Sequence, residues 1–420
     1  MTTEHAVARV LEYVTRDRLA EAIGGIVDIP SPTGSEAVVA QWIVDDLTTH
    51  GVPALLQPLD DRQANAVGMV AGGNGPSTLL YAPLDTFTTG DPAYDVPSAA
   101  LAMRPDMVPR AVRHGDLVEG LGAGNPKGHA ACVLVTLQAL AASGVHLAGD
   151  VVGGFGAGGM PSFALDSGRQ NTGHGVGAAF LLERGFTTDH AVIAKPGWNV
   201  SHEEVGLVWL DVLVPGIHTY AGSRHRLPYH NAVVRAGEVA AHLEEWLEDY
   251  AVRHETGTMR PQGIVSSITG GSERLAASTP AQVRLRLDLR ITTEQTAAAV
   301  TREVRAEVEK LGADLRVEQV AAVPASHTSP DAPIVRAAVA AWEAVAAEAH
   351  VPIAQNSGAT DANILRMRGV PTARVGMPKV PATPAGDPPD FTAGMNLADL
   401  REMRRLVEIL VRTVLLVEGG

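Results

Sequence analysis

The sequence predicts an α/β protein in which a mostly parallel sheet is covered by helices and a ferredoxin-like α+β domain is inserted. Three observations predict this fold. The chain has 420 residues, more than one typical core holds, so we expect two domains. Short apolar runs alternate with helical stretches up to residue 206, and between residues 207 and 320 the order changes to β-α-β-β-α-β. We therefore expect residues 1–206 and 321–420 to form the α/β domain and residues 207–320 to form the insert.

The first domain opens with two predicted helices. Helical spacing of apolar residues runs over 16–29 and stops at 30–34, which read Pro-Ser-Pro-Thr-Gly. Ser35 can then cap a second helix that continues to residue 47. Apolar runs alternate with helical stretches such as 127–142, and they predict strands of a parallel sheet at 66–70, 78–82, 151–155 and 191–194. An open α/β sheet places its site at the carboxyl ends of such strands.

The insert begins at 207–214, where apolar and polar residues alternate. Its other predicted elements are a helix at 231–250, strands at 264–269 and 281–289, a helix at 293–311 and a strand at 314–320. This order is that of a ferredoxin-like domain. The chain then returns to the first domain near residue 323 and closes with predicted helices at 333–349, 360–367 and 397–418.

Composition and charge exclude several classes of function. The formal net charge is −14 and no run of Lys or Arg offers a phosphate-binding stripe, so we expect no nucleic-acid partner. Cys132 is the only cysteine, which excludes an intrachain disulfide and a cysteine-based metal site. Its apolar neighbours indicate a buried, inert thiol. No apolar run approaches the roughly 20 residues of a membrane span. Residues 1–5 do not open a secretory signal, so we expect a cytoplasmic protein without membrane contact.

Three segments carry the main functional signal. Residues 80–86 read Leu-Tyr-Ala-Pro-Leu-Asp-Thr, residues 120–128 read Gly-Leu-Gly-Ala-Gly-Asn-Pro-Lys-Gly, and residues 193–196 read Ile-Ala-Lys-Pro. They resemble the aminoacylase, acetylornithine deacetylase and carboxypeptidase-G type family of dinuclear-zinc peptidases. In that family the segments read apolar-x-His-x-Asp-Thr, Gly-Arg-Gly-x-x-Asp-x-Lys-Gly and apolar-x-Glu/Asp-Pro. Further matches at 280–290 and 357–362 extend the resemblance over nearly the whole chain.

The resemblance implies a zinc-aminopeptidase-like catalytic domain, a lid and dimerisation role for the insert, and a homodimer. The chain departs from the family at its ligand and general-base positions. These positions hold, in order, Pro83, Asn125, Gly159, Met160, Lys195 and Pro389. A zinc ion needs imidazole, thiolate or carboxylate ligands at about 2 Å. We therefore expect no bound metal and no other cofactor.

Lys195 and Asp85 stand at the centre of the expected site. Asp85 keeps the second half of the His-x-Asp motif, and Lys195 brings a cation to a position where the family holds a metal ligand. Because the family places both positions around one cavity, we expect the ammonium within about 3–4 Å of the carboxylate. One interpretation is a salt bridge that replaces the zinc ions and does no chemistry. The other is catalysis, with Lys195 as proton donor, electrostatic clamp or amine nucleophile and Asn125 orienting a substrate carbonyl.

Two histidines are further candidates. His129 follows the Lys-Gly of the second motif at a helix start. There it either faces the cavity as an acid or base near neutral pH or is simply solvated. His174 lies in the loop 167–175, which is rich in Gly with Arg, Asn and His and either binds an anion or is merely mobile.

Three candidates in the insert follow from the resemblance. Tyr220 falls where the family has the His that stabilises the reaction's oxyanion from a neighbouring subunit, and His218 is two residues away. Asn231 matches a family Asn that follows. The exchange of His for Tyr removes another catalytic group.

A second set of candidates would bind the substrate carboxylate. Gly358, Ala359, Thr360 and Asp361 form a turn that opens a predicted helix, and its backbone N–H groups can bind an anion. Arg290 is either a partner for that carboxylate or a structural residue.

Together these features predict a divergent family member that acts without metal on an amide or other C–N or acyl bond of a small carboxylate-bearing molecule. Two alternatives stay open. The first is a catalytically inactive homologue that binds a small acid or regulates a partner. The second is a metal-dependent amidohydrolase with relocated ligands, drawn from Asp85, His129, Asp387, Asp390 or the run 201–204.

Overall fold

The computed structural model describes residues 2–166 and 168–417. The chain divides into two compact units. The first contains Met1–His202, Thr328–Pro352 and Thr360–Gly420, and the second contains Glu203–His327 and Ile353–Ala359. The domain boundaries expected from the sequence, after residues 206 and 320, stay a prediction about which parts of the chain fold independently.

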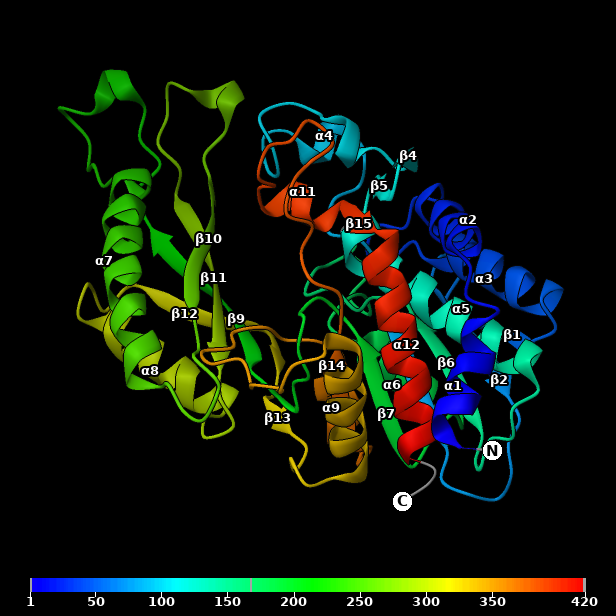
Figure 1. Cartoon of the computed structure of the whole chain (residues 1–420). Coiled ribbons are helices and arrows are strands. Elements are labelled where there is room, and N and C mark those ends of the chain that lie inside the picture. Colours follow the sequence, from blue (N-terminus) through cyan, green and yellow to red (C-terminus); the bar gives the residue numbers. More distant parts are fainter. Residues whose placement is uncertain (1, 167, 418–420) are drawn as a thin grey trace. The chain divides into compact units, whose positions relative to one another are not determined.

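A six-stranded sheet forms the centre of the first unit, in the order β1-β2-β6-β3-β7-β14 (Figure 1). Its strands are β1 (Ala54–Pro58), β2 (Ala64–Val70), β3 (Thr78–Pro83), β6 (Val151–Gly156), β7 (His190–Ala194) and β14 (Thr372–Val375). The β3 strand pairs in parallel with β6 and β7, and β14 pairs in parallel with β7. Only β1 and β2 run antiparallel to their neighbours. The mostly parallel sheet is therefore confirmed.

Helices cover both faces of this sheet. One core joins a face of the sheet to α1 (Thr3–Leu11), α2 (Arg16–Val27), α3 (Ala37–Thr49), α5 (Gly128–Ser143), α9 (Pro333–Ala346) and α12 (Leu400–Val417). The opposite face packs against α6 (Val176–Glu183) and α10 (Ala362–Met367). The α5 helix is apolar almost all round because it is buried along nearly its whole length. Cys132 on this helix is buried, as expected for an inert thiol.

A small three-stranded sheet lies elsewhere in the first unit, in the order β15-β5-β4. Its strands are β4 (Val112–His114), β5 (Leu117–Glu119) and β15 (Leu397–Asp399). The last predicted helix therefore begins at Leu400 and not at residue 397, because residues 397–399 pair with β5. Short helices α4 (Pro92–Asp95) and α11 (Phe391–Met395) and the η2 turn (Ala123–Lys127) complete the unit.

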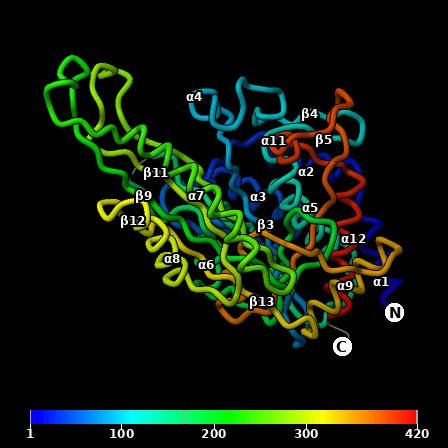
Figure 2. The backbone as a smooth tube through the Cα atoms, turned by 90° about the vertical axis from the view of Figure 1, so that its left-hand side faces the viewer, coloured from blue at the N-terminus to red at the C-terminus, as the bar shows by residue number. Residues whose placement is uncertain are grey.

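The second unit has the ferredoxin-like order that the sequence predicts. Its elements are β9 (Gly206–Pro215), α7 (Ala232–Arg253), β10 (Gly263–Gly270), β11 (Gln282–Ile291), α8 (Ala297–Glu309) and β12 (Arg316–Val323). The four strands form an antiparallel sheet in the order β10-β11-β9-β12. Both helices share one core with the sheet, which explains the alternating pattern of β11. The loops 217–231 and 271–280 lie side by side in both views, joined by a backbone bridge from Tyr220 to Ser278 (Figures 1 and 2).

Two short strands of the second unit, β8 (Glu203–Glu204) and β13 (Ser326–His327), pair with each other. No helix within the described residues combines the length and the apolar character that crossing a bilayer requires.

Candidate functional site

The carboxyl ends of β3 and β7 bring two of the candidate residues into one unit. Asp85 follows β3 by two residues and Lys195 follows β7 directly. The two strands are neighbours and run parallel, so both residues lie at the same edge of the sheet. This edge is where open α/β sheets bind their ligands.

Asp85 is fully buried and held by hydrogen bonds. Its carboxylate accepts from the Thr33 hydroxyl at 2.7 Å, the Gly159 N–H at 2.7 Å and the Met160 N–H at 3.0 Å. Burial raises the pKa of Asp85, and the nearby charge of Lys195 opposes that rise. The expected salt bridge with Lys195 stays a prediction, and backbone and hydroxyl donors also hold the carboxylate.

Lys195 is 5% exposed and lies against Asn125. Its Nζ donates to Asn125 Oδ1 at 3.4 Å and lies 3.7 Å from Met160 Sδ. The Nδ2 group of Asn125 donates to Met395 Sδ at 3.5 Å. Because an ammonium can only donate, it fixes which end of the Asn125 side chain is the oxygen.

Glu36 is a buried acid that the sequence analysis missed. Its Oε1 accepts from the N–H groups of Gly34 at 2.8 Å and Gly158 at 3.0 Å, whereas its buried Oε2 has no hydrogen-bond partner among the described residues. Burial, followed by the charge of Asp85, raises its pKa to about 8. No local signal marks this residue, because an acidic residue just before a helix ordinarily indicates an exposed favourable charge.

Asp361 also lies in this buried region. The Tyr81 hydroxyl donates to Asp361 Oδ2 at 2.8 Å, and both side chains are buried. Burial and the charge of Asp361 raise the pKa of Tyr81 well above its usual range. Thr360 Oγ1 accepts from the Ala362 N–H at 3.2 Å, at the first residue of the six-residue helix α10.

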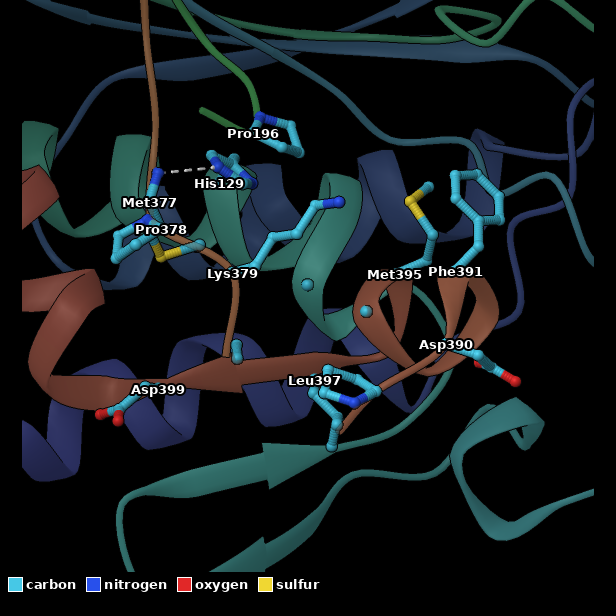
Figure 3. Close-up of a pocket in the computed structure, with 14 residues that line it drawn as sticks. His129, Pro196, Met377, Pro378, Lys379, Asp390, Phe391, Met395, Leu397 and Asp399 are labelled. Atoms are coloured by element: carbon cyan, nitrogen blue, oxygen red, sulfur yellow. Dashed lines mark hydrogen bonds between the residues drawn. The ribbon is translucent and has the colours of Figure 1, made fainter. Parts of the chain in front are cut away.

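His129 is buried and neutral. Its Nε2 accepts from the Met377 N–H at 3.4 Å, as the dashed line in Figure 3 marks. Burial, followed by the charge of Lys195, lowers its pKa to about 3. The solvated interpretation of this residue is therefore wrong, because His129 is buried, whereas its expected position at a cavity is found, since it lines the smaller one. A group that titrates near pH 3 is a poor acid or base at pH 7.

His174 lies in a loop that packs onto the first unit. Its ring meets Phe163 edge to face at 5.1 Å, and its backbone has a positive φ of 55°. Arg169 of the same loop donates to the Gly34 carbonyl and to Asp60, each at 2.7 Å. The Arg169 guanidinium therefore binds groups of the protein itself. Residue 167 of the expected loop lies outside the described residues.

The other candidates belong to the second unit. Tyr220 is 58% exposed, and His218, also exposed, makes a 2.7 Å hydrogen bond to the Thr279 carbonyl. Asn231 caps α7 by accepting from the Val233 N–H at 3.0 Å. Arg290 forms a two-pronged pair with Asp288 at 2.8 and 3.2 Å, which favours the structural interpretation of this arginine.

Gly358 and Ala359 are also in the second unit, whereas Thr360 and Asp361 are in the first. The Gly358 N–H donates to Asn356 Oδ1 at 3.0 Å. One of the backbone donors expected to bind a carboxylate is therefore already used.

Two cavities of the first unit lie beside Asn125 and His129. The first has a volume of about 360 Å³ and is lined by residues that include Thr86, Phe87, Asn125, Phe391, Met395 and Asn396. The second has a volume of about 230 Å³ and is lined by residues that include His129, Pro196, Met377, Lys379, Phe391 and Met395 (Figure 3). Helix α11 lies between them, since Phe391 and Met395 line both. These cavities offer space for a small molecule at the expected edge of the sheet.

The residues at the family's metal positions do not fit a zinc ion. Pro83 offers no side-chain donor, and the Lys195 ammonium occupies the space beside Asn125. A side chain at Gly159 would place its Cβ 2.3 Å from Pro83 Cβ and 2.5 Å from Asp361 Oδ2. Within residues 2–166 and 168–417, no three His, Cys, Asp or Glu side chains gather in a way that could hold a metal ion. The relocated-ligand alternative therefore lacks a ligand cluster there.

No family model matches this chain, but solved structures do. Human carnosine dipeptidase 1 is 13% identical, with a TM-score of 0.74 and 99% of each chain covered. A dinuclear metal-binding peptidase of the M20 family from Bacillus subtilis is 14% identical, with a TM-score of 0.61, 96% of this chain and 98% of that chain covered. A hydantoinase/carbamoylase family amidase from Burkholderia ambifaria is 16% identical, with a TM-score of 0.60, 97% of this chain and 98% of that chain covered. The chain therefore has the fold of the M20 peptidases and amidohydrolases, as its sequence resemblance predicts.

Proposed function

We propose that this protein is a metal-independent enzyme that acts on an amide or other C–N or acyl bond of a small carboxylate-bearing molecule. The observation that carries this proposal is the buried ammonium of Lys195, 3.4 Å from Asn125 Oδ1, at the end of β7. It supplies positive charge at a position where the resembled family holds a metal ligand. A cytoplasmic location and the absence of a nucleic-acid partner belong to the same proposal, supported by the net charge of −14.

Asn125 would donate an N–H to the carbonyl oxygen of the substrate, and the Lys195 ammonium, bound to Asn125 Oδ1, would add positive charge behind it. Attack on an amide carbonyl moves negative charge onto that oxygen, and a preorganised cation and N–H donor in a water-poor site stabilise it. Asp85 would act at a distance, because its field favours the charged form of Lys195. Its own oxygens are bound to Thr33, Gly159 and Met160. His129 would line the site as an uncharged side chain.

A screen of N-acyl amino acids, dipeptides and cyclic amides tests the proposal. Turnover and thermal stabilisation are measured in the same samples. We expect at least one of these compound classes to be hydrolysed or otherwise cleaved. The Lys195→Met variant should lose this activity. Stabilisation by several compounds without turnover of any would contradict the enzymatic proposal.

A specific observation favours an inactive small-acid binder as the second candidate. The family's general-base position corresponds to Gly159, whose backbone N–H is bound to Asp85 and whose Cα faces Pro83. No carboxylate can act as a base from that position. If the protein is such an inactive binder, the same compounds should bind to it and none should be turned over.

Removal of metal ions is expected to change neither stability nor activity, because the ligand positions hold Pro83, Asn125, Lys195 and Pro389. The measurement is the melting temperature and turnover before and after dialysis against a strong chelator, with metal content determined by mass spectrometry. A stoichiometric transition metal whose removal abolishes activity would show that relocated ligands exist.

We further propose that the protein is a homodimer formed through residues 207–320, which would then be a lid and dimerisation domain. Strand β10 is an edge of its sheet and exposes Ile264 (53%) and Ile268 (56%). Open edges with apolar side chains favour pairing with another chain. Light scattering at micromolar concentration should give a dimer mass, and Ile268→Lys should shift it towards the monomer. A monomer of the unmodified protein would contradict the proposal, and Leu101→Lys, at a 91% exposed residue of the first unit, is the control.

A further inference from the structure

The larger of the two cavities is lined by two aromatic residues together with polar ones such as Asn125 and Asn396. Phe87 follows β3 and Phe391 begins α11, and both line the cavity while remaining 44% and 74% exposed. Met395, one turn after Phe391 on α11, adds a sulfur to the wall. Asn125 lies in the same wall. Exposed aromatic side chains around a cavity are typical of a ligand site and not of a packed core.

The side chain of Asn125 presents a donor to this cavity. Its oxygen accepts from Lys195, so its NH₂ group is turned to the other side. There, among the residues that the structure describes, it donates to the thioether sulfur of Met395 at 3.5 Å. A thioether is a weak acceptor, and a carbonyl oxygen in its place would form a better hydrogen bond. The ligand therefore needs a carbonyl-type oxygen next to an apolar group.

We infer that this cavity binds the acyl side of the substrate, that the acyl group is aromatic, and that Asn125 Nδ2 donates to its carbonyl oxygen. The inference rests on the proposed function for the bond that is attacked, but the binding it describes does not require turnover. The volume of about 360 Å³ is in the range of small-molecule pockets and holds a single ring with its linker. The ring packs between Phe87 and Phe391, where offset or edge-to-face contacts between rings are favourable.

Calorimetric titration of the whole chain with two probes tests the inference. N-phenylacetylglycine and N-acetylglycine share the carboxylate and the amide and differ in the ring. We expect the first to bind about tenfold or more tightly than the second, since burying a ring of this size favours binding by about that factor. A ratio near one, or no binding of either probe at millimolar concentration, would overturn the inference. N-cyclohexylacetylglycine keeps the size of the ring without its π system, and equal binding of this compound would overturn the aromatic assignment.

Two variants separate the two parts of the site. Phe391→Ala should reduce the ratio of affinities to about one to three, because it removes a wall that only the ring contacts. Asn125→Leu should weaken both probes by the same factor of about five to fifteen and leave the ratio intact, because both carry the carbonyl. Leu101→Ala removes a similarly exposed apolar side chain that does not line the cavity and serves as the control. An unchanged ratio in Phe391→Ala would contradict the inference.

Failure of the proposed function gives a different result. If no amide is cleaved but the affinity ratio and its loss in Phe391→Ala are found, the acyl-binding site stands and the enzymatic proposal falls. If amides are cleaved without preference for the aromatic acyl group, the enzymatic proposal stands and this inference falls.

Discussion

A Lys195→Met variant is expected to lose about 10²–10³-fold in kcat on whichever amide substrate the screen identifies, which is the usual effect of removing one donor to a developing oxyanion. Lys195 is 5% exposed and its Nζ already lies 3.7 Å from the Met160 sulfur, so an uncharged chain of similar length should be accommodated. The measurement is steady-state kinetics with the melting temperature of each sample. The loss should appear in kcat because the charge on the oxygen develops in the transition state.

Lys310→Met is the matched control, since it makes the same chemical change at an exposed lysine of the second unit that pairs with Glu307. It should leave kcat unchanged. A double variant with Asn125→Leu should lose less than the product of the two single losses, because the two side chains contact each other. A Lys195→Met protein with unchanged turnover would show that the buried ammonium takes no part in the reaction and would favour the inactive binder.

The second large effect is expected at Glu36, as a dependence of stability on pH. The difference in free energy of unfolding between Glu36→Gln and the unmodified protein should grow by about 2–4 kcal/mol in favour of the variant between pH 5 and pH 9. The cause is burial, followed by the charge of Asp85, which raises the pKa of Glu36 to about 8 in the folded protein. An unfolded chain titrates the same group near its ordinary value.

The direction follows from proton binding. Between the ordinary glutamate pKa and about 8, the folded protein holds a proton on Glu36 that the unfolded chain has lost, so folding is disfavoured as the pH rises. The contribution of protonated Glu36 to the free energy of unfolding is therefore fully present below about pH 4 and is lost by about pH 8. The titratable groups that interact with this carboxyl include Asp85, Tyr81 and Arg169; Tyr81 keeps its proton because its pKa is raised, and Arg169 is a cation.

Denaturant unfolding at a series of pH values measures this effect. Gln lacks the titrating group but keeps an oxygen that can accept from Gly34 and Gly158. Its NH₂ group would be an unpaired buried donor, which adds a constant cost and leaves the slope with pH as the diagnostic quantity. Glu348→Gln, at an exposed glutamate, should follow the unmodified protein at every pH. A Glu36→Gln curve parallel to the unmodified one would show that Glu36 titrates normally.

Much of the fold could be read from periodicity. The runs at 78–82 and 191–194 became β3 and β7 with only one residue added to each, because strands buried on both faces are continuously apolar and end at polar loops. The β-α-β-β-α-β order of the second unit was visible because one face of its sheet is exposed and the pattern alternates. Strand β1 and the pairing of residues 397–399 were missed, since neither has a period of its own.

The sequence by itself determined the fold and which side chains are absent from the site, because a proline, a glycine or a lysine at a ligand position is a chemical fact before any folding. Only the tertiary structure decided what the remaining polar groups do. Asp85 is held by Thr33 and by the N–H groups of residues 159–160, and Glu36 is buried beside it, through contacts over 52 to 122 residues of chain. Hydrogen bonds and burial depend on distance in space, and a local pattern of residues carries no information about partners so far along the chain. The contact of the Lys195 ammonium with Asn125 Oδ1 likewise joins residues 70 positions apart.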